Sequence, residues 1–177
     1  MIDVPKLPDV LAADLRVVFC GTAAGTQSAL KQAYYAGPGN RFWRVLRELE
    51  LTDAEIVPVD YRDTLLYGIG LTDVCKFHSG MDKELPSGAF APDELEAKVA
   101  EIKPHTIAFN GKKAAQIALG FRSTAELDYG RHRGSFGGAV AWVLPSTSGA
   151  ANGHWNITHW RALATALPAR PRVSHRP

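Results

Sequence analysis

The chain has 177 residues, of which 46% are hydrophobic and 21% charged, and its formal net charge is +2. This composition suits one domain with a sizeable core; it excludes a mostly disordered chain and a protein that binds polyanions by bulk charge alone. No apolar run reaches the ~18 residues of a membrane helix. The N-terminus carries acids and prolines, unlike a signal peptide, so we expect a cytoplasmic protein.

Apolar runs and amphipathic stretches alternate along the chain. In chain order they predict a strand at 16–20, a helix at 41–49 capped by Asn40, a strand at 65–74, a helix at 92–103, a strand at 105–110, a helix at 111–119, a strand at 140–144 and a helix at 155–167. This alternation predicts a three-layer α/β fold with a four-stranded, mainly parallel sheet flanked by helices. We expect a single domain over residues 1–167 and a frayed, basic, proline-rich tail over 168–177.

The small net charge hides an uneven distribution. Residues 1–105 hold 11 Lys and Arg against 16 Asp and Glu, whereas residues 106–177 hold 9 against 2. Such asymmetry is a weak indication of a polyanionic partner.

The residues that follow the expected strands are the first place to look for a site. Ligands bind open parallel sheets outside the carboxyl ends of the strands. All four segments there are small, polar or glycine-containing: Gly21–Gly25, Thr72–Asp73, Asn110–Lys112 and Pro145–Gly149. We expect them to line one shallow pocket whose floor is mostly backbone.

Motifs for phosphate loops, dinucleotides and metals are missing from the sequence. GTAAG lacks the GxxxxGK[ST] and GxGxxG patterns, and there is no HExxH, CxxC or clustered acidic site, so we expect no metal. Cys20 and Cys75 lie in apolar runs and are expected to be reduced core thiols.

Taken together, several blocks resemble the uracil-DNA glycosylase superfamily, in particular its mismatch-specific uracil/thymine branch. GTAAGTQSA at 21–29 resembles the GINPG motif and the serine-containing stretch after it. PGNRFW at 38–43 resembles PxNRFW, and LPSTSG at 144–149 resembles LPNPSG. GLTD at 70–73 and NGK at 110–112 are similar to two shorter motifs of the family.

The resemblance extends over about residues 16–167, nearly the whole chain. It implies a sheet between helices and a DNA base-excision repair enzyme. Such an enzyme extrudes a damaged base, hydrolyses its N-glycosidic bond and leaves an abasic site, without metal or organic cofactor. We expect a monomer that acts on uracil-containing duplex or single-stranded DNA and has no membrane partner.

The resemblance also implies roles for single residues. Phe42 would be the aromatic platform for the extruded base, with a plain core role as the alternative, and Trp43 would be core. The expected wall around the base consists of Gly21, Thr22, Ala23, Ala24, Gly25, Ser28 and Asn110. The residues expected to contact DNA are Lys112, Ser146, Thr147, Ser148, Gly149, Asn152 and His154.

One departure from the family pattern concerns the attacking water. The asparagine of GINPG, which positions that water, is replaced here by Ala23. Asp73 is the nearest carboxylate at an expected strand exit, and we expect it to orient the water and to stabilise the oxocarbenium-like sugar. The alternative role for Asp73 is a turn cap, and Asp82 is the reserve candidate.

A second departure lies in the late loop, where Ala150 and Ala151 follow the SG pair in place of a bulky residue. Asn152 or His154 would then fill the gap left by the flipped base, although His154 is also placed to contact phosphate or the leaving uracil anion. Two alternatives to uracil excision stay open. One is a glycosylase for hypoxanthine, thymine in T·G or ethenocytosine, and the other is a catalytically inactive DNA-binding relative.

Overall fold

The structure is a computed structural model, and it describes residues 3–171. Its centre is a five-stranded sheet with the order β2-β1-β3-β5-β4. The strands are β1 (Val17–Ala24), β2 (Ile69–Ser79), β3 (Thr106–Asn110), β4 (Gly130–Phe136) and β5 (Ala139–Leu144). The first three and β5 pair in parallel, and β4 pairs with β5 in the antiparallel sense. The α/β class with a mainly parallel sheet is therefore confirmed.

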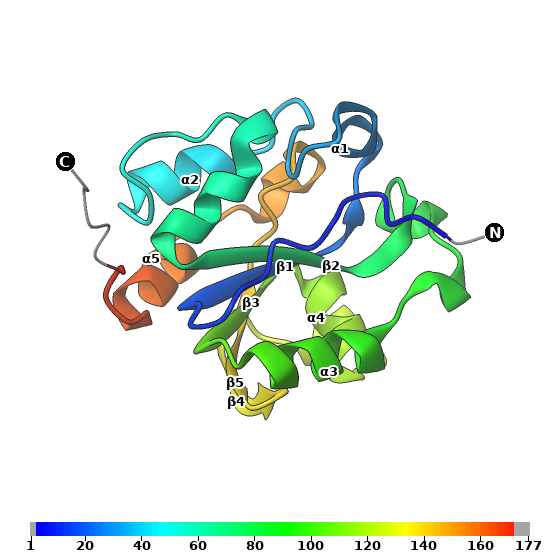
Figure 1. Cartoon of the computed structure of the whole chain (residues 1–177). Helices are drawn as coiled ribbons and strands as arrows, with labels where there is room; N and C mark the ends of the chain where they lie inside the picture. Colours follow the sequence, from blue (N-terminus) through cyan, green and yellow to red (C-terminus); the bar gives the residue numbers. More distant parts are fainter. Residues whose placement is uncertain (1–2, 172–177) are drawn as a thin grey trace.

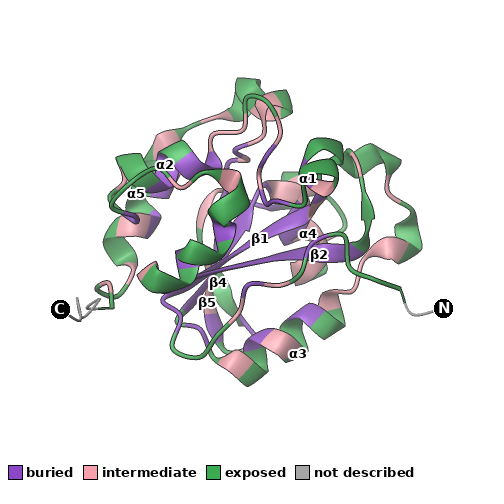
Figure 2. Ribbon diagram, turned by 45° about the horizontal axis from the view of Figure 1, so that its top comes forward, coloured by how far each residue is buried: buried purple, intermediate pink, exposed green. Residues whose placement is uncertain are grey.

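Helices cover both faces of the sheet (Figure 1). One face carries α1 (Thr26–Lys31), α2 (Phe42–Glu48) and α5 (Ile157–Ala166), and the other carries α3 (Pro92–Ile102) and α4 (Lys112–Leu119). Phe19 of β1 belongs to the core cluster under α2 and α5, and the next residue, Cys20, belongs to the cluster under α3 and α4. Strands β1, β3 and β5 are accordingly buried between the two helical layers (Figure 2).

Short 3-10 segments complete the fold: η1 (Pro58–Tyr67), η2 (Asp82–Glu84), η3 (Ser87–Ala89), η4 (Thr124–Glu126) and η5 (Gly149–His154). Within residues 3–171, no helix is long and apolar enough to cross a bilayer.

The prediction of four strands was one too few, because β4 carries no apolar run. Its sequence, GRHRGSF, is mostly exposed, as an edge strand covered on one face can be. A hairpin turn at Gly137 and Gly138, both with positive φ, connects it to β5.

The boundaries of β2 also differ from the prediction. The expected strand at 65–74 begins only at Ile69, since residues 65–67 close η1 and Gly68 ends it with φ 70°. At its other end β2 continues to Ser79. Asp73 therefore lies within the strand and does not follow its end, which corrects the expected strand exit at this position.

The first part of the expected tail lies against the domain. Arg16 Nη1 donates to the Pro168 carbonyl at 3.3 Å, and the Arg170 side chain pairs with Asp53. The remainder of that tail, residues 172–177, lies outside the described residues.

Candidate active site

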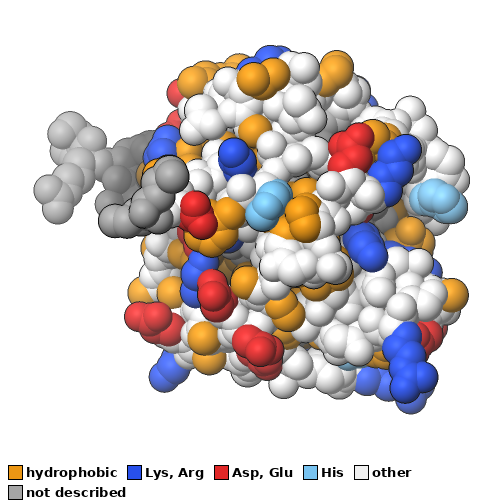
Figure 3. Space-filling view, turned by 90° about the vertical axis from the view of Figure 1, so that its right-hand side faces the viewer, with side chains coloured by type: hydrophobic (Ala, Val, Ile, Leu, Met, Phe, Trp, Pro, Cys, Tyr) orange, Lys and Arg blue, Asp and Glu red, His pale blue; other side chains and the backbone are white. Residues whose placement is uncertain are grey.

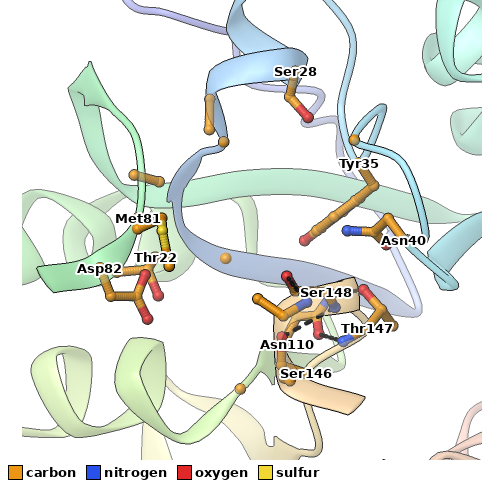
Figure 4. A pocket seen from close by; sticks show the side chains of 18 of the residues that line it. Thr22, Ser28, Tyr35, Asn40, Met81, Asp82, Asn110, Ser146, Thr147 and Ser148 are labelled. Carbon is orange, nitrogen blue, oxygen red and sulfur yellow. Dashed lines mark hydrogen bonds between the residues drawn. The ribbon is translucent and has the colours of Figure 1, made fainter. Parts of the chain in front are cut away.

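A cavity of about 630 Å³ opens at the carboxyl ends of β1 and β3. Figure 4 shows Ser28, Tyr35 and Asn40 along one side, Thr22, Met81 and Asp82 at another, and Asn110 with Ser146–Ser148 below. The cavity brings together these residues of the predicted wall: Gly21, Thr22, Ala23, Ala24, Gly25, Ser28 and Asn110. Asp73 lines it as well.

Among residues 3–171, Asp73 is the one buried carboxylate that faces this cavity. Its residue is 5% exposed, and within residues 3–171 its side chain makes no hydrogen bond or ion pair. Burial raises the pKa of Asp73 to about 6, against the opposing effect of Lys76 and with a further increase from Asp9. The group is therefore mostly ionised at neutral pH and still close enough to neutrality to exchange a proton.

Gly21 makes room for that carboxylate. The two residues are Cα partners in the β1–β2 ladder. A Cβ atom on Gly21 would stand 2.6 Å from Asp73 Oδ1 and 3.5 Å from the Tyr35 hydroxyl. The Asp73 approach is too close for any side chain at this position, whereas 3.5 Å is an ordinary contact distance, so the carboxylate is what requires glycine here.

Tyr35 is among the aromatic residues that line the cavity, and Phe42 is not. Phe42 is 0% exposed and is not among the residues that line the cavity. The ring of Tyr35 stacks on it, with centroids 4.0 Å apart and planes at 29°. The prediction of Phe42 as the platform is therefore wrong, because its ring is enclosed beneath that of Tyr35. Phe42 instead supports Tyr35 from the core, where it also contacts Phe19 and Trp160.

The hydroxyl of Tyr35 is buried and has no hydrogen-bond partner within the described residues. Burial, and next the charge of Asp73, raise the pKa of Tyr35 well above its usual value, although the Asn110 side chain partly offsets this. Tyr35 therefore remains neutral and keeps a donor that its surroundings do not use.

Two residues of the predicted wall are engaged by the protein itself. Ser28 Oγ accepts a hydrogen bond from the Ala36 amide at 3.0 Å, which closes the segment that carries Tyr35. Asn110 Oδ1 accepts from the Thr147 amide at 3.0 Å, and its Nδ2 donates to Thr147 Oγ1 at 2.9 Å. Asn110 thus fixes the loop after β5, and only part of its amide remains free for a ligand.

The loop at 145–149 packs tightly against the segment before α2. Thr147 is 0% exposed, and its carbonyl accepts from the Arg41 amide at 2.9 Å. A Cβ on Gly149 would stand 3.2 Å from the Pro38 carbonyl oxygen. Thr147 is thus enclosed, although it lines the cavity together with its neighbours, Ser146 and Ser148.

The remaining predicted DNA contacts lie around the rim. Lys112, at the start of α4, places Nζ 4.6 Å from the centre of the Tyr129 ring, and both line the cavity. His154 is exposed and lines the cavity, whereas Asn152 is exposed outside it. Asp82 lies at the rim in η2, on the side of Thr22. The face seen in Figure 3 mixes acidic, basic and histidine side chains.

Sequence reasoning missed Tyr35 and the groups around Asp73. The tandem tyrosines before AGPGN were a signal for an aromatic wall, but the NRFW motif drew the prediction to Phe42. Lys76 and Asp9 are 67 residues apart, and their 2.7 Å ion pair has no local signature in the sequence. Among residues 3–171, no group of three or more His, Cys, Asp or Glu side chains is arranged to hold a metal ion.

Comparison with known proteins decides the family. A sequence model of the uracil DNA glycosylase superfamily matches residues 8–166. The chain belongs to this superfamily. Membership makes it a DNA glycosylase by family, with DNA as its partner. The resemblance seen in the motifs is thereby confirmed at the level of the superfamily, and the mismatch-specific branch stays a prediction.

A solved structure agrees with this assignment. The fold is similar to the solution NMR structure of a Methanosarcina acetivorans protein provisionally named a uracil DNA glycosylase. The two share 25% sequence identity and a TM-score of 0.59, over 93% of this chain and 96% of that chain.

Proposed function

We propose that this DNA glycosylase flips uracil out of DNA and hydrolyses its N-glycosidic bond, leaving an abasic site. The observation that carries the proposal is the Asp73 carboxylate, which is buried, unpartnered within residues 3–171 and open to a cavity at the carboxyl ends of the strands. A buried carboxylate costs stability unless something compensates, and such groups cluster at functional sites.

The cavity suits a planar base with polar edges. The Tyr35 ring forms one wall, on which the flipped base stacks. The backbone of β1 and its exit, from Gly21 to Gly25, brings amides and carbonyls to the edge of the base without bulky side chains in the way. The neutral Tyr35 hydroxyl adds a donor next to Asp73.

In the chemical step Asp73 accepts a proton from the attacking water. The water oxygen bonds to C1′ of the deoxyribose while the C1′–N bond breaks, and the electron pair of that bond leaves with the base, which takes a proton from solvent afterwards. The negative charge of Asp73 also stabilises the cationic sugar as the bond breaks. Asp73 thereby takes the role of the asparagine of the GINPG motif, whose position is occupied here by Ala23.

The residues at the rim of the cavity bind the DNA backbone. Ser146 and Ser148 present hydroxyls and amides to phosphate oxygens, and Lys112 and His154 add cationic or hydrogen-bonding groups. We assign to Asn152, which is exposed outside the cavity, the contact with the duplex where the base has left it.

A second candidate is excision of a base larger than uracil. A Cβ atom on Gly25 would meet nothing within 4 Å, so the cavity is open on that side. This space would admit a methyl group or a second ring, as thymine and hypoxanthine require.

The two candidates separate in one excision assay. The full-length protein is incubated with oligonucleotides holding U·G, U·A, T·G, I·T or single-stranded U, and abasic sites are cleaved with alkali. The proposal predicts that uracil is released fastest, and faster release of thymine or hypoxanthine would favour the second candidate. Binding without cleavage of any substrate would contradict both and indicate an inactive relative.

A further inference from the structure

Behind the cavity, a cluster of charged groups joins the N-terminal segment to the edge strand β2. Asp9 Oδ1 accepts from Lys76 Nζ at 2.7 Å, and Asp9 Oδ2 accepts from Lys98 Nζ at 2.8 Å. The Thr72 hydroxyl donates to Asp9 Oδ1 at 2.7 Å, and Lys76 Nζ also donates to the Tyr34 hydroxyl at 3.2 Å. Although burial opposes it, these ammonium and hydroxyl groups lower the pKa of Asp9.

The charges of this cluster do not balance by themselves. Two ammonium groups share the single Asp9 carboxylate, which leaves one surplus positive charge. Lys98 is 38% exposed and solvated, whereas the Lys76 side chain is 9% exposed. The Asp73 carboxylate, 5% exposed and three residues before Lys76 on β2, supplies the missing negative charge when it is ionised.

Lys76 lies on β2 where its ladder with β1 is interrupted. Ala23 pairs with Cys75 but Ala24 pairs with Ser79, so residues 76–78 have no partner on β1. Lys76 shares Asp9 Oδ1 with Thr72, four residues earlier, and its ammonium group also reaches Tyr34, which lines the cavity. No hydrogen bond or ion pair joins Lys76 to Asp73, so the charge of Lys76 acts on the Asp73 carboxylate by longer-range electrostatic attraction.

The other groups that face Asp73 do not replace this charge. Burial raises the pKa values of Cys20 on β1 and of Tyr35 before α2 well above their usual values, and it raises the pKa of Tyr34 as well. All three side chains are therefore neutral. Asp9 is negative and acts against ionisation of Asp73. Lys98 on α3 is more exposed, so solvent screens it more strongly.

We propose that Lys76 is a positioning residue whose buried ammonium group, held by Asp9 and Tyr34, keeps the Asp73 carboxylate ionised without touching the substrate. The N-terminal segment thereby belongs to the site through Asp9, more than 60 residues away from Asp73 in sequence. The consequence for catalysis rests on the proposed function, but the electrostatic relation itself does not.

The direct test is an NMR titration of the Asp73 side-chain carboxyl in the full chain. Lys76→Met is expected to raise the titration midpoint of Asp73 by about one pH unit or more, since an opposite charge nearby lowers a carboxyl pKa by about 1–3 units. Lys76→Arg should keep the wild-type midpoint. Lys98→Met, which removes an ammonium group from the same Asp9, should shift the Asp73 midpoint by only about a few tenths of a pH unit, because Lys98 is exposed. If Lys76→Met does not fold, Lys76→Gln, which still donates to Asp9, removes the same charge.

Single-turnover excision across pH gives the catalytic readout. The acid limb of Lys76→Met should move upward with the Asp73 midpoint, and its rate should return to that of the wild type at alkaline pH, where Asp73 is ionised again. A variant damaged only in its fold would not recover there. An unchanged Asp73 midpoint in Lys76→Met overturns the inference, and so does a shifted midpoint with an unmoved acid limb. If the wild type excises no base, the proposed function fails, while the titration still decides whether Lys76 holds Asp73 ionised.

Discussion

Asp73 Oδ1 lies 2.6 Å from the point where a Cβ atom on Gly21 would stand. Gly21→Ala should therefore push the carboxylate out of place and reduce excision by about 100-fold, since a misplacement of about 1 Å at a reacting group costs that much. Gly88→Ala is the matched control, because Gly88 does not line the cavity and a Cβ there meets nothing within 4 Å among the described residues. Equal rates for the two variants would contradict the role of this close approach.

Tyr35 and Phe42 should respond differently to truncation. Phe42→Ala empties a fully buried site and should lower the free energy of unfolding by about 3–5 kcal/mol. Tyr35→Ala should instead weaken binding of DNA with a flipped base by about 1–3 kcal/mol, the value of one stacking contact. Urea unfolding and a binding titration measure the two effects. Loss of binding in a folded Phe42→Ala protein, with none in Tyr35→Ala, would restore Phe42 as the platform.

The hydroxyl of Tyr35 allows a narrower change. Because it has no partner among the described residues, Tyr35→Phe should not lower the free energy of unfolding by more than about 0.5 kcal/mol, in contrast to the usual loss of a buried hydrogen bond. Urea unfolding measures this, with Tyr34→Phe as the control, since the Tyr34 hydroxyl is bonded to Lys76 and to the Pro8 carbonyl. A loss in Tyr35→Phe as large as in Tyr34→Phe would show that the hydroxyl has a partner.

Which features the sequence could predict depends on how local their causes are. The alternation of strands and helices, and the wall at residues 21–25, follow from short-range patterns, and the superfamily is carried by PGNRFW and LPSTSG. Strand β4 was missed because an exposed edge strand needs no apolar run. The end of β2 was missed because the bulge after Cys75 and the pairing with β1 extend a strand past its apolar part.

In the site, too, the features with local causes were predicted and those that depend on long-range packing were not. Asp73 was found for its place near other predicted strand exits, although it lies inside β2. Tyr35 and Phe42 are both aromatic and seven residues apart, and only the packing shows which ring covers the other. The Asp9–Lys76 pair is a contact between the N-terminal segment and a distant strand, which no spacing in the sequence indicates.

Asp73 should reduce the stability of the protein at neutral pH. Burial gives this carboxyl a pKa of about 6 in the folded chain, against about 3.9 in an unfolded one. The folded state therefore holds the proton more tightly, and stability falls as pH rises between about 4 and 6. Asp73→Asn should be more stable than the wild type by about 3 kcal/mol at pH 8 and nearly equal to it near pH 4. Urea unfolding at both pH values measures the difference, with Asp128→Asn, at an exposed position outside the cavity, as the control. A difference that did not depend on pH would contradict this prediction.

Lys112 should contribute one phosphate contact. Lys112→Met is expected to weaken DNA binding for every sequence and to reduce the slope of log affinity against log salt by about 1. Lys103→Met is the control, because Lys103 is exposed just before β3, at the opposite end of the strand from the cavity. The same slope in Lys112→Met and the wild type would remove Lys112 from the DNA interface.

The measurement closest to the central claim is the single-turnover rate of uracil excision by Asp73→Ala beside Asp82→Ala. Both variants lose a carboxylate that lines the same cavity, but only Asp73 is buried against β1. Asp73→Ala is expected to lose activity by at least about 100-fold, the effect of removing a general base, while Asp82→Ala stays near the wild-type rate. Full activity in Asp73→Ala, or its loss in Asp82→Ala alone, would contradict the catalytic role of Asp73.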